Sequence, residues 1–150
     1  MKNKLRWEVK SFQELSNLEL YECMKLRQMV FSWEQHCAYI DCDDKDVMSY
    51  HVCGYLSQRL VAYSRIIPPE VAFADVSIGR ISTHPQYRSL GHGKELIKFS
   101  IEQTERLFGS VPITIGAQKW LRHFYEKVGF ESLGIEYLED GISHIVMRRK

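Results

Sequence analysis

A strand, a glycine-containing turn and a long helix follow one another between residues 74 and 109, and this unit constrains the fold most strongly. Residues 74–83 (ADVSIGRIST) are apolar and β-branched, which predicts a strand. Residues 91–109 repeat apolar side chains at helical spacing and end at Gly109. A long amphipathic helix that follows a strand buries its apolar face against the sheet. The unit therefore predicts a layered protein of helices on a sheet.

Hydrophobic periodicity predicts further elements on both sides of this unit. Ser16 and Glu19 form a capping-box signature at the start of the first helix. The order β-α-β-β-β-α-β-α-β-β predicts one α/β (α+β) domain over residues 1–150, with strands of mixed direction. The expected elements are strands at 5–12, 46–56, 59–68 and 111–117, helices at 16–35 and 118–130, and a closing hairpin at 131–149 with its turn at Asp140-Gly141.

Composition and charge exclude several classes of protein. The 20 basic and 19 acidic residues leave a net charge of +1, which provides no field for binding nucleic acid. No apolar run reaches the roughly 18 residues that cross a bilayer, and the N-terminus MKNKLRWEVK lacks the apolar core of a signal peptide. We therefore expect a cytoplasmic protein with no nucleic-acid partner and no membrane contact.

The cysteines do not form a recognisable metal motif. None of the four has a CxxC partner. Zinc donors are nevertheless present in one part of the sequence: His36, Cys37, Cys42, His51 and Cys53. Buried thiols are the favoured interpretation, because cytosolic cysteines are usually reduced and packed. The acidic stretch DCDDKD lacks the glycine and the final glutamate of a calcium loop, and we interpret it as a solvated loop. We expect no metal.

The turn HPQYRSLGHG, at residues 84–93, has the features of an anion site. The first N–H groups of a helix lack partners, and the helix dipole favours negative charge there. Gly91 and Gly93 allow a phosphate to approach the backbone closely. Arg88 and Lys94 add positive charge beside it. A plain tight turn before a helix is the alternative interpretation.

Two common phosphate motifs are absent from this turn. A Walker loop needs GxxxxGK followed by Ser or Thr. A dinucleotide fingerprint needs a third glycine, and Leu96 stands there. A Rossmann-like nucleotide binder is therefore disfavoured. The pattern that remains is Arg-x-x-Gly-x-Gly, formed by Arg88, Gly91 and Gly93.

A second motif lies downstream, where QKWLRHFYEKVGF contains the pattern FYxxxGF. Together with the turn and the strand order, it resembles the GNAT superfamily of N-acetyltransferases, whose acyl-CoA pyrophosphate turn reads Gln/Arg-x-x-Gly-x-Gly/Ala. The stretches VFSWEQ, SIGRIST, IGAQ and EDGISHIVM further resemble the ElaA-like branch. The resemblance extends from the first strand to the last hairpin.

The resemblance implies a GNAT-like fold, with a mixed central sheet of about seven strands flanked by helices. Its fourth and fifth strands would splay apart, and acetyl-CoA would lie in the gap as the cosubstrate. Gly79 fits a bulge that starts this splay. The residues implied to bind pantetheine through their backbone, and to polarise the thioester carbonyl, are Ile81, Ser82 and Thr83. The residues implied to bind the pyrophosphate are Arg88, Ser89, Leu90, Gly91, His92, Gly93 and Lys94.

The same resemblance implies catalytic roles. The Tyr125 hydroxyl would protonate or stabilise the leaving thiolate, whereas a tyrosine packed in the core is the alternative. Gln118 would bond to pantetheine, although the superfamily often has asparagine at this place. An amine nucleophile must lose a proton, and we favour Glu34 as the general base over Asp75 and His144.

Four residues are predicted on the acceptor side. An arginine inside a strand needs a partner, so Arg80 is expected to contact a substrate carboxylate or to pair with Glu34. Trp33 and Trp120 are predicted to line the acceptor pocket, with the core as the alternative for such large aromatics. His144 is predicted to contact the substrate.

The predicted activity is transfer of an acetyl group from acetyl-CoA to a primary amine by direct attack. No cysteine lies in the motifs, which disfavours a covalent enzyme intermediate. The acceptor, a small molecule or a peptide, is left open among a small amine, an antibiotic, an amino acid, a peptide N-terminus and a lysine side chain. A non-catalytic acyl-CoA-binding or sensor module is the alternative. We expect a monomer or a homodimer formed through an exposed edge strand.

Overall fold

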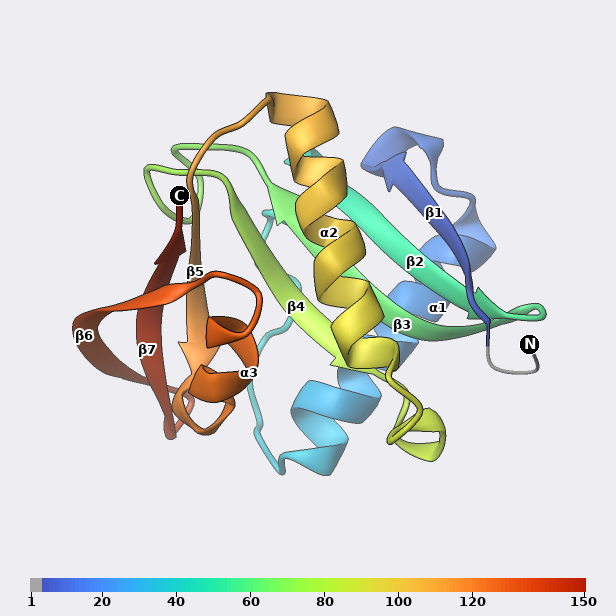
Figure 1. The fold of residues 1–150 in the computed structure, drawn as a ribbon. Helices are drawn as coiled ribbons and strands as arrows, with labels where there is room; N and C mark the ends of the chain where they lie inside the picture. The colour runs from blue at the N-terminus through green and yellow to red at the C-terminus, as the bar shows by residue number, and fades with distance from the viewer. Residues whose placement is uncertain (1–3) are drawn as a thin grey trace.

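The computed structural model describes residues 4–150 as two antiparallel sheets flanked by helices (Figure 1). The strands of the first sheet, in spatial order, are β1 (Arg6–Ser11), β2 (Tyr50–Leu56), β3 (Arg59–Ile67) and β4 (Ser77–Thr83). The strands of the second sheet are β5 (Ile113–Gln118), β7 (Ile142–Arg149) and β6 (Glu131–Glu139).

The two sheets meet where β4 begins beside β5. A single parallel bridge joins Val76 to Ile113, and the Thr114 N–H donates to the Val76 carbonyl at 3.0 Å. Strand directions are therefore mixed at this junction and antiparallel within each sheet. The predicted α/β (α+β) class is confirmed, but the strands form a four-stranded and a three-stranded sheet rather than one central sheet. The Rossmann-like alternative is wrong, because that fold needs a parallel sheet.

Helices cover both faces of the first sheet. In Figure 1, α2 (His92–Phe108) lies across the front of β3 and β4, and α1 (Asn17–Arg27) lies behind them. Successive residues of a strand point to opposite faces. Val52 accordingly packs in the cluster that contains α2 residues, and Cys53 in the cluster that contains α1 residues. The short α3 (Arg122–Glu126) follows β5.

Several predicted boundaries shift in the structure. The capping box of Ser16 and Glu19 is confirmed, but the helix predicted to Gln35 changes after Arg27 into a π-helical segment, Gln28–Glu34. The strand predicted from residue 46 begins only at Tyr50. The residues before it form a 3₁₀ turn, because the Asp46 carboxylate is drawn onto buried arginines.

The closing hairpin has the predicted turn. Asp140 and Gly141 have φ of 51° and 78°, and two left-handed residues form the type I′ turn that matches the twist of paired strands. In this register Tyr137 lies opposite His144. The two side chains therefore share one face of the second sheet.

The expected bulge in β4 is present but is not centred on glycine. Arg65 opposes Gly79 and Tyr63 opposes Ser82, so Arg80 and one further residue face a single residue of β3. Arg80 has φ of 48°, a conformation that favours glycine. The bulge therefore begins just after Gly79, and an arginine holds it.

No helix within residues 4–150 is both long and apolar enough to cross a membrane. The cytoplasmic location remains a prediction from the sequence.

Gly54 in β2 makes room for an aromatic ring. Trp7 of β1 is its register partner, and the Trp7 ring stacks on Phe99 of α2 with centroids 5.2 Å apart. A Cβ at Gly54 would lie 2.7 Å from the Trp7 ring. The glycine thus lets β1 and α2 share one packed layer.

We predict that Gly54→Ala lowers the free energy of unfolding by about 1–3 kcal/mol, because the added methyl displaces the Trp7 ring. Urea denaturation followed by tryptophan fluorescence measures the change. Gly79→Ala is the matched control. A Cβ there would lie 3.6 Å from Ile67, an ordinary contact, and we expect a change within about 0.5 kcal/mol. Equal losses in the two variants would contradict this packing argument.

Candidate active site

A cleft of about 900 Å³ opens where β4 and β5 separate. Residues 77–83 of β4 form one wall, and Ile115, Gly116 and Gln118 of β5 form the facing wall. Beyond the bridge at Val76 these two strands share no ladder within the described residues. Their facing backbone groups can therefore bond an extended ligand, as an unpaired sheet edge does.

The turn before α2 offers free hydrogen-bond donors. Gly91 is the N-cap residue, with φ of 83° and no side-chain cap. The Glu95 N–H makes the first helical bond, to the Gly91 carbonyl at 3.2 Å. The N–H groups of His92, Gly93 and Lys94 have no backbone partner in residues 4–150. Three donors and the positive end of the helix dipole thus point away from the helix.

The His92 ring at this turn is buried and unsatisfied. Only 2% of His92 is exposed, and neither ring nitrogen has a hydrogen-bond partner among the described residues. Buried polar groups are nearly always bonded. A Cβ added to Gly91 would meet no atom within 4 Å, so the space over the turn is open. The turn therefore has open space above Gly91 and an unsatisfied imidazole beneath it.

Arg88 is bound to Glu34 across the mouth of the cleft. Its guanidinium donates to the two carboxylate oxygens of Glu34 at 2.6 and 2.7 Å and to the Thr83 carbonyl at 3.1 Å. Both charged side chains are more than a third exposed. Such a pair contributes only about 0–1 kcal/mol. A phosphate can therefore replace Glu34 as the partner of Arg88 at small cost.

Tyr125 on α3 reaches the wall of the same cleft. Only 5% of the residue is exposed, and its ring packs edge-on against Phe124 and Phe130. Burial raises the pKa of its phenol well above the usual range. The group is therefore protonated at neutral pH and available as a donor.

The two tryptophans predicted at the acceptor pocket lie in different parts of the structure. Trp120 lines the cleft, and its indole N–H donates to the Gln118 side-chain oxygen at 2.7 Å. Gln118 also exchanges long hydrogen bonds with Gln35, at 3.3 and 3.5 Å. Trp33 is 79% exposed and lies instead on a separate shallow groove beside Lys25. The prediction that Trp33 lines the acceptor pocket is not supported, because the π-helical turn directs it away.

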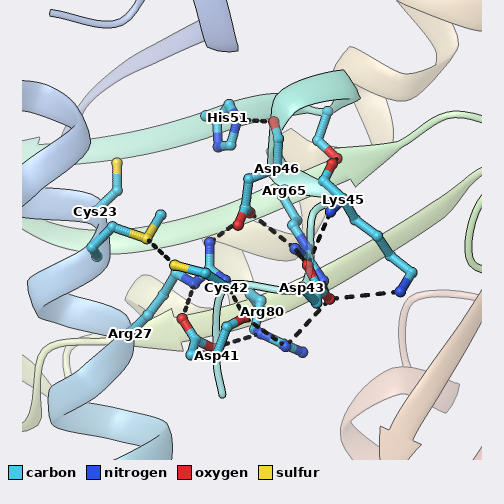
Figure 2. Close-up of polar contacts among 12 residues, drawn as sticks. Cys23, Arg27, Asp41, Cys42, Asp43, Lys45, Asp46, His51, Arg65 and Arg80 are labelled. Carbon is cyan, nitrogen blue, oxygen red and sulfur yellow. Dashed lines mark hydrogen bonds and ion pairs between the residues drawn. The ribbon is translucent and has the colours of Figure 1, made fainter. Parts of the chain in front are cut away.

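The acidic loop before β2 is not solvated as predicted. Figure 2 shows its carboxylates among three arginines from α1, β3 and β4. Arg27 is fully buried and donates to Asp46 at 2.6 Å. Arg65 binds both oxygens of Asp43, at 2.7 and 2.6 Å, and also Asp46 at 2.9 Å. Burying these charges is favourable only because each one is paired.

Arg80 belongs to this cluster rather than to Glu34. Its Nε donates to Asp41 at 2.8 Å, and a terminal nitrogen lies 3.4 Å from Asp43 (Figure 2). The expected pairing with Glu34 is therefore wrong, since Glu34 is bound to Arg88. These ion pairs hold the acidic loop against the bulge in β4. Arg80 forms a wall of the cleft with its charge already neutralised.

The arginines also control ionisation within the cluster. Burial opposes the charge of Asp46, but the hydrogen bond and charge of Arg27, with Arg65, outweigh burial and hold its pKa below the usual range. The same balance, with Arg65 as the main cation, holds the pKa of Asp43 well below its usual range. Both carboxylates are ionised at neutral pH.

His144 and Tyr137 form an aromatic pair on the acceptor side of the cleft. Their rings stack with centroids 5.3 Å apart. The His144 Nδ1 lies 2.8 Å from the Ile142 carbonyl, and Nε2 lies 3.6 Å from a Glu139 carboxylate oxygen. The Tyr137 hydroxyl lies directly over Gly116, where any Cβ would collide with it. The absence of a side chain at Gly116 of β5 therefore leaves the space that the Tyr137 hydroxyl occupies.

Asp75 has a structural role. It accepts hydrogen bonds from Thr114 at 2.8 Å and Arg148 at 2.9 Å, and these bonds lower the pKa of its carboxylate. It does not line the cleft. The contacts connect the chain just before β4 to β5 and β7, at the point where the sheets part.

Sequence reasoning missed much of the acceptor wall: Cys37, Tyr39, Phe73, Tyr137 and Glu139 line the cleft. The hairpin turn could have identified Tyr137, because its register places that residue opposite His144. Glu139 ends the same strand, β6, and the other three come from loops, whose placement depends on tertiary contacts. Within residues 4–150 no group of three His, Cys, Asp or Glu side chains is arranged to hold a metal ion.

Known proteins match this chain along nearly its whole length. Residues 42–150 match the family model described as an acetyltransferase (GNAT) domain. The chain is 34% identical to ElaA of Escherichia coli (strain K12) over 148 residues, 97% of each protein. The crystal structure of Escherichia coli ElaA superposes with a TM-score of 0.90 over 97% of this chain and 99% of that one.

Two further solved structures have the same fold. An acyl-CoA N-acyltransferase from Pseudomonas aeruginosa is 34% identical and superposes with a TM-score of 0.93, covering 98% of this chain and all of its own. A GNAT family acetyltransferase from Elizabethkingia anophelis with acetyl-CoA bound is only 13% identical. It superposes with a TM-score of 0.69 over 99% of both chains.

The splayed strands, the open turn before α2 and these matches define the class of protein. The chain belongs to the GNAT acetyltransferase family. Within that family it is similar to ElaA, at the same level of identity in sequence and structure searches. The resemblance to the ElaA-like branch is confirmed.

We predict that Asp46→Asn lowers the free energy of unfolding by about 3 kcal/mol at pH 7, because two buried arginines lose a shared carboxylate. The lowered pKa of Asp46 determines how the stability of the folded protein changes with pH. The charge stabilises the folded protein above the ordinary aspartate pKa of about 4, and this contribution is lost as pH falls toward the lowered value. Urea denaturation from pH 7 to pH 3 measures both effects.

Over that range we expect a flatter stability profile for Asp46→Asn than for the wild type. Glu136→Gln is the control, since Glu136 forms an exposed pair with Lys119. We expect it to change stability by about 1 kcal/mol or less. Parallel profiles for Asp46→Asn and wild type would contradict the assigned role of the cluster.

Proposed function

We propose that this protein transfers an acetyl group from acetyl-CoA to a primary amine by direct attack. The observation that carries the proposal is the cleft between β4 and β5, which joins an open turn at the start of α2 to a buried tyrosine on α3. Family membership and the acetyl-CoA held by the Elizabethkingia neighbour support the choice of cosubstrate.

The residues of the cleft fit an acyl-CoA. The free N–H groups of His92, Gly93 and Lys94 would hold the pyrophosphate, together with Arg88. The turn residues Ser89 and Leu90 complete that loop. The free edge of β4, from Ile81 to Thr83, would bond the pantetheine amides from one side. Gln118 would approach them from β5.

Acetyl-CoA supplies the thioester, whose C–S bond breaks as an amine nitrogen bonds to the carbonyl carbon. A backbone N–H on the β4 edge would bond the carbonyl oxygen as negative charge develops there. The Tyr125 hydroxyl would give a proton to the departing sulfur. The buried, protonated state of this phenol suits that role, because a donor must still hold its proton at neutral pH.

Among residues 4–150, the acceptor side carries no unpaired arginine. Arg65 and Arg80 are bound by Asp41 and Asp43, and Glu139 and Asp140 lie at the hairpin turn on the same side. A substrate carboxylate would find no free guanidinium in this wall. Arg80 is therefore not proposed to bind a substrate carboxylate.

We predict that Gly93→Asp weakens acetyl-CoA binding at least about 10-fold, because the new carboxylate faces the pyrophosphate turn. Gly93 tolerates a side chain: a Cβ there meets Phe124 and Thr83 only at 3.9 Å. An acidic residue in the first turn also favours helix formation. Isothermal titration calorimetry measures the affinity. Gly93→Ala is the control and is expected to bind within about threefold of wild type.

Unchanged acetyl-CoA affinity in a folded Gly93→Asp protein would place the cofactor elsewhere. No binding to the wild type would reject both the enzyme and the alternative of a non-catalytic acyl-CoA sensor.

We predict that Tyr125→Phe lowers kcat about 100-fold while acetyl-CoA affinity stays the same, because the ring remains and only the proton donor is lost. The assay follows thiol release from acetyl-CoA with a panel of primary amines, including polyamines, amino acids, aminoglycosides and lysine peptides. Tyr21→Phe, on an exposed tyrosine of α1, is the control. Tight binding without amine-dependent thiol release in the wild type would instead support the sensor.

A further inference from the structure

We propose that His144 is the general base of this reaction, acting through Nε2 in the Nδ1–H tautomer. The inference rests on the proposed amine acetylation and names the residue that removes the proton. His144 lines the cleft on the acceptor side and is 8% exposed. On β7 it pairs with Tyr137 of β6 across the hairpin and with Gln118 of β5 on the other side.

The hydrogen bond of Nδ1 determines the tautomer. The Ile142 carbonyl, 2.8 Å from Nδ1, can only accept, so Nδ1 must carry the proton. In the neutral ring Nε2 then holds the free lone pair. Nε2 has no hydrogen-bond partner within residues 4–150. A base with its lone pair unengaged is what proton abstraction needs.

Two side chains surround the ring where an imidazolium would form. A Glu139 carboxylate oxygen lies 3.6 Å from Nε2, where it would attract the positive charge of an imidazolium. Tyr137 stacks on the ring at 5.3 Å and fixes its plane. Glu139 is on β6 and Ile142 on β7, so the hairpin turn sets the two contacts from opposite strands.

The other two candidates for the base are less suitably placed. Glu34 lies at the cofactor end of the cleft, where both its oxygens accept hydrogen bonds from Arg88, and a phosphate that replaced it there would leave the released carboxylate beside another anion. Asp75 is bonded to Thr114 and Arg148 and does not line the cleft. His144 alone of the three combines a place on the acceptor side of the cleft with a free basic atom. The role first given to Glu34 therefore passes to His144.

The proton balance assigns each transfer to a named atom. The acceptor enters as an ammonium with three N–H protons. Nε2 of His144 takes the first and passes it to solvent at the cleft mouth. When the C–N bond has formed and the C–S bond breaks, Tyr125 gives its proton to sulfur, and the second proton leaves the nitrogen and restores the Tyr125 hydroxyl through water. The products are an amide that keeps one N–H, a free thiol and one proton in water.

The first test is independent of turnover. Two-bond ¹H–¹⁵N correlation spectra of the wild-type protein distinguish the two neutral tautomers of each histidine, and His144→Gln assigns the signal. We expect His144 in the Nδ1–H form, both free and with CoA bound. An Nε2–H tautomer would overturn the proposal, because the basic atom would then face the Ile142 carbonyl.

The second test is chemical rescue in the amine acetylation assay. We expect His144→Gln and His144→Ala to lower kcat/KM about 100-fold or more, with acetyl-CoA affinity by calorimetry within about threefold of wild type. Added imidazole should raise the kcat/KM of His144→Ala at least about 10-fold, because it fits the space that the side chain vacates. It should not raise the kcat/KM of His144→Gln. His123→Gln is the matched control, because the His123 side chain is 89% exposed on α3.

Two outcomes separate this proposal from the function on which it rests. If the wild type acetylates no amine, the proposed function fails, and the assignment of His144 fails with it. If the wild type is active and both His144 variants keep its kcat/KM, only the assignment fails. Loss of activity without imidazole rescue in His144→Ala would also overturn it, because a purely structural role predicts that result.

Discussion

The separation of β4 from β5 is the constraint on which the rest of this structure depends. One bridge joins the two sheets at Val76 and Ile113, and beyond it the strands share no ladder in the described residues. Unpaired backbone groups inside a protein are costly unless another partner bonds them. The same divergence that breaks the sheet therefore creates an extended polar edge along the cleft. Asp75, just before β4, fixes its starting point through contacts to β5 and β7 of the second sheet.

The buried ion cluster determines the shape of one wall. Arg80 has a left-handed conformation in the bulge of β4, and Asp41 and Asp43 hold its guanidinium. Arg27 pairs with the Asp41 carboxylate from α1, and Arg65 pairs with the Asp43 carboxylate from β3. A buried pair of charges stabilises less than apolar packing of similar volume, but its directional bonds specify one arrangement. We infer that the cluster fixes the position of the acidic loop rather than adding net stability.

The distribution of partners also divides the cleft into two chemical halves. At the cofactor end, the donors are backbone N–H groups and an arginine whose exposed partner is easily replaced. At the acceptor end, the arginines are already neutralised, and the lining groups include an imidazole nitrogen and the carboxylates of Glu139 and Asp140. The first half suits an anion and the second half suits a cation. An acyl-CoA and an ammonium have those opposite charges, which agrees with the proposed reaction.

The sequence by itself determined the order of the elements, the α2 turn with Gly91 and Gly93, the position of Tyr125 and the hairpin turn. These are local properties, set by periodicity, capping and turn chemistry, which act over a few residues. Only the tertiary structure decided which charges meet. Asp43 and Arg65, or Glu34 and Arg88, are far apart in sequence, and their pairing depends on how loops cross the sheet. For that reason the predicted partner of Arg80, the solvated acidic loop and the place of Trp33 all changed, whereas the fold did not.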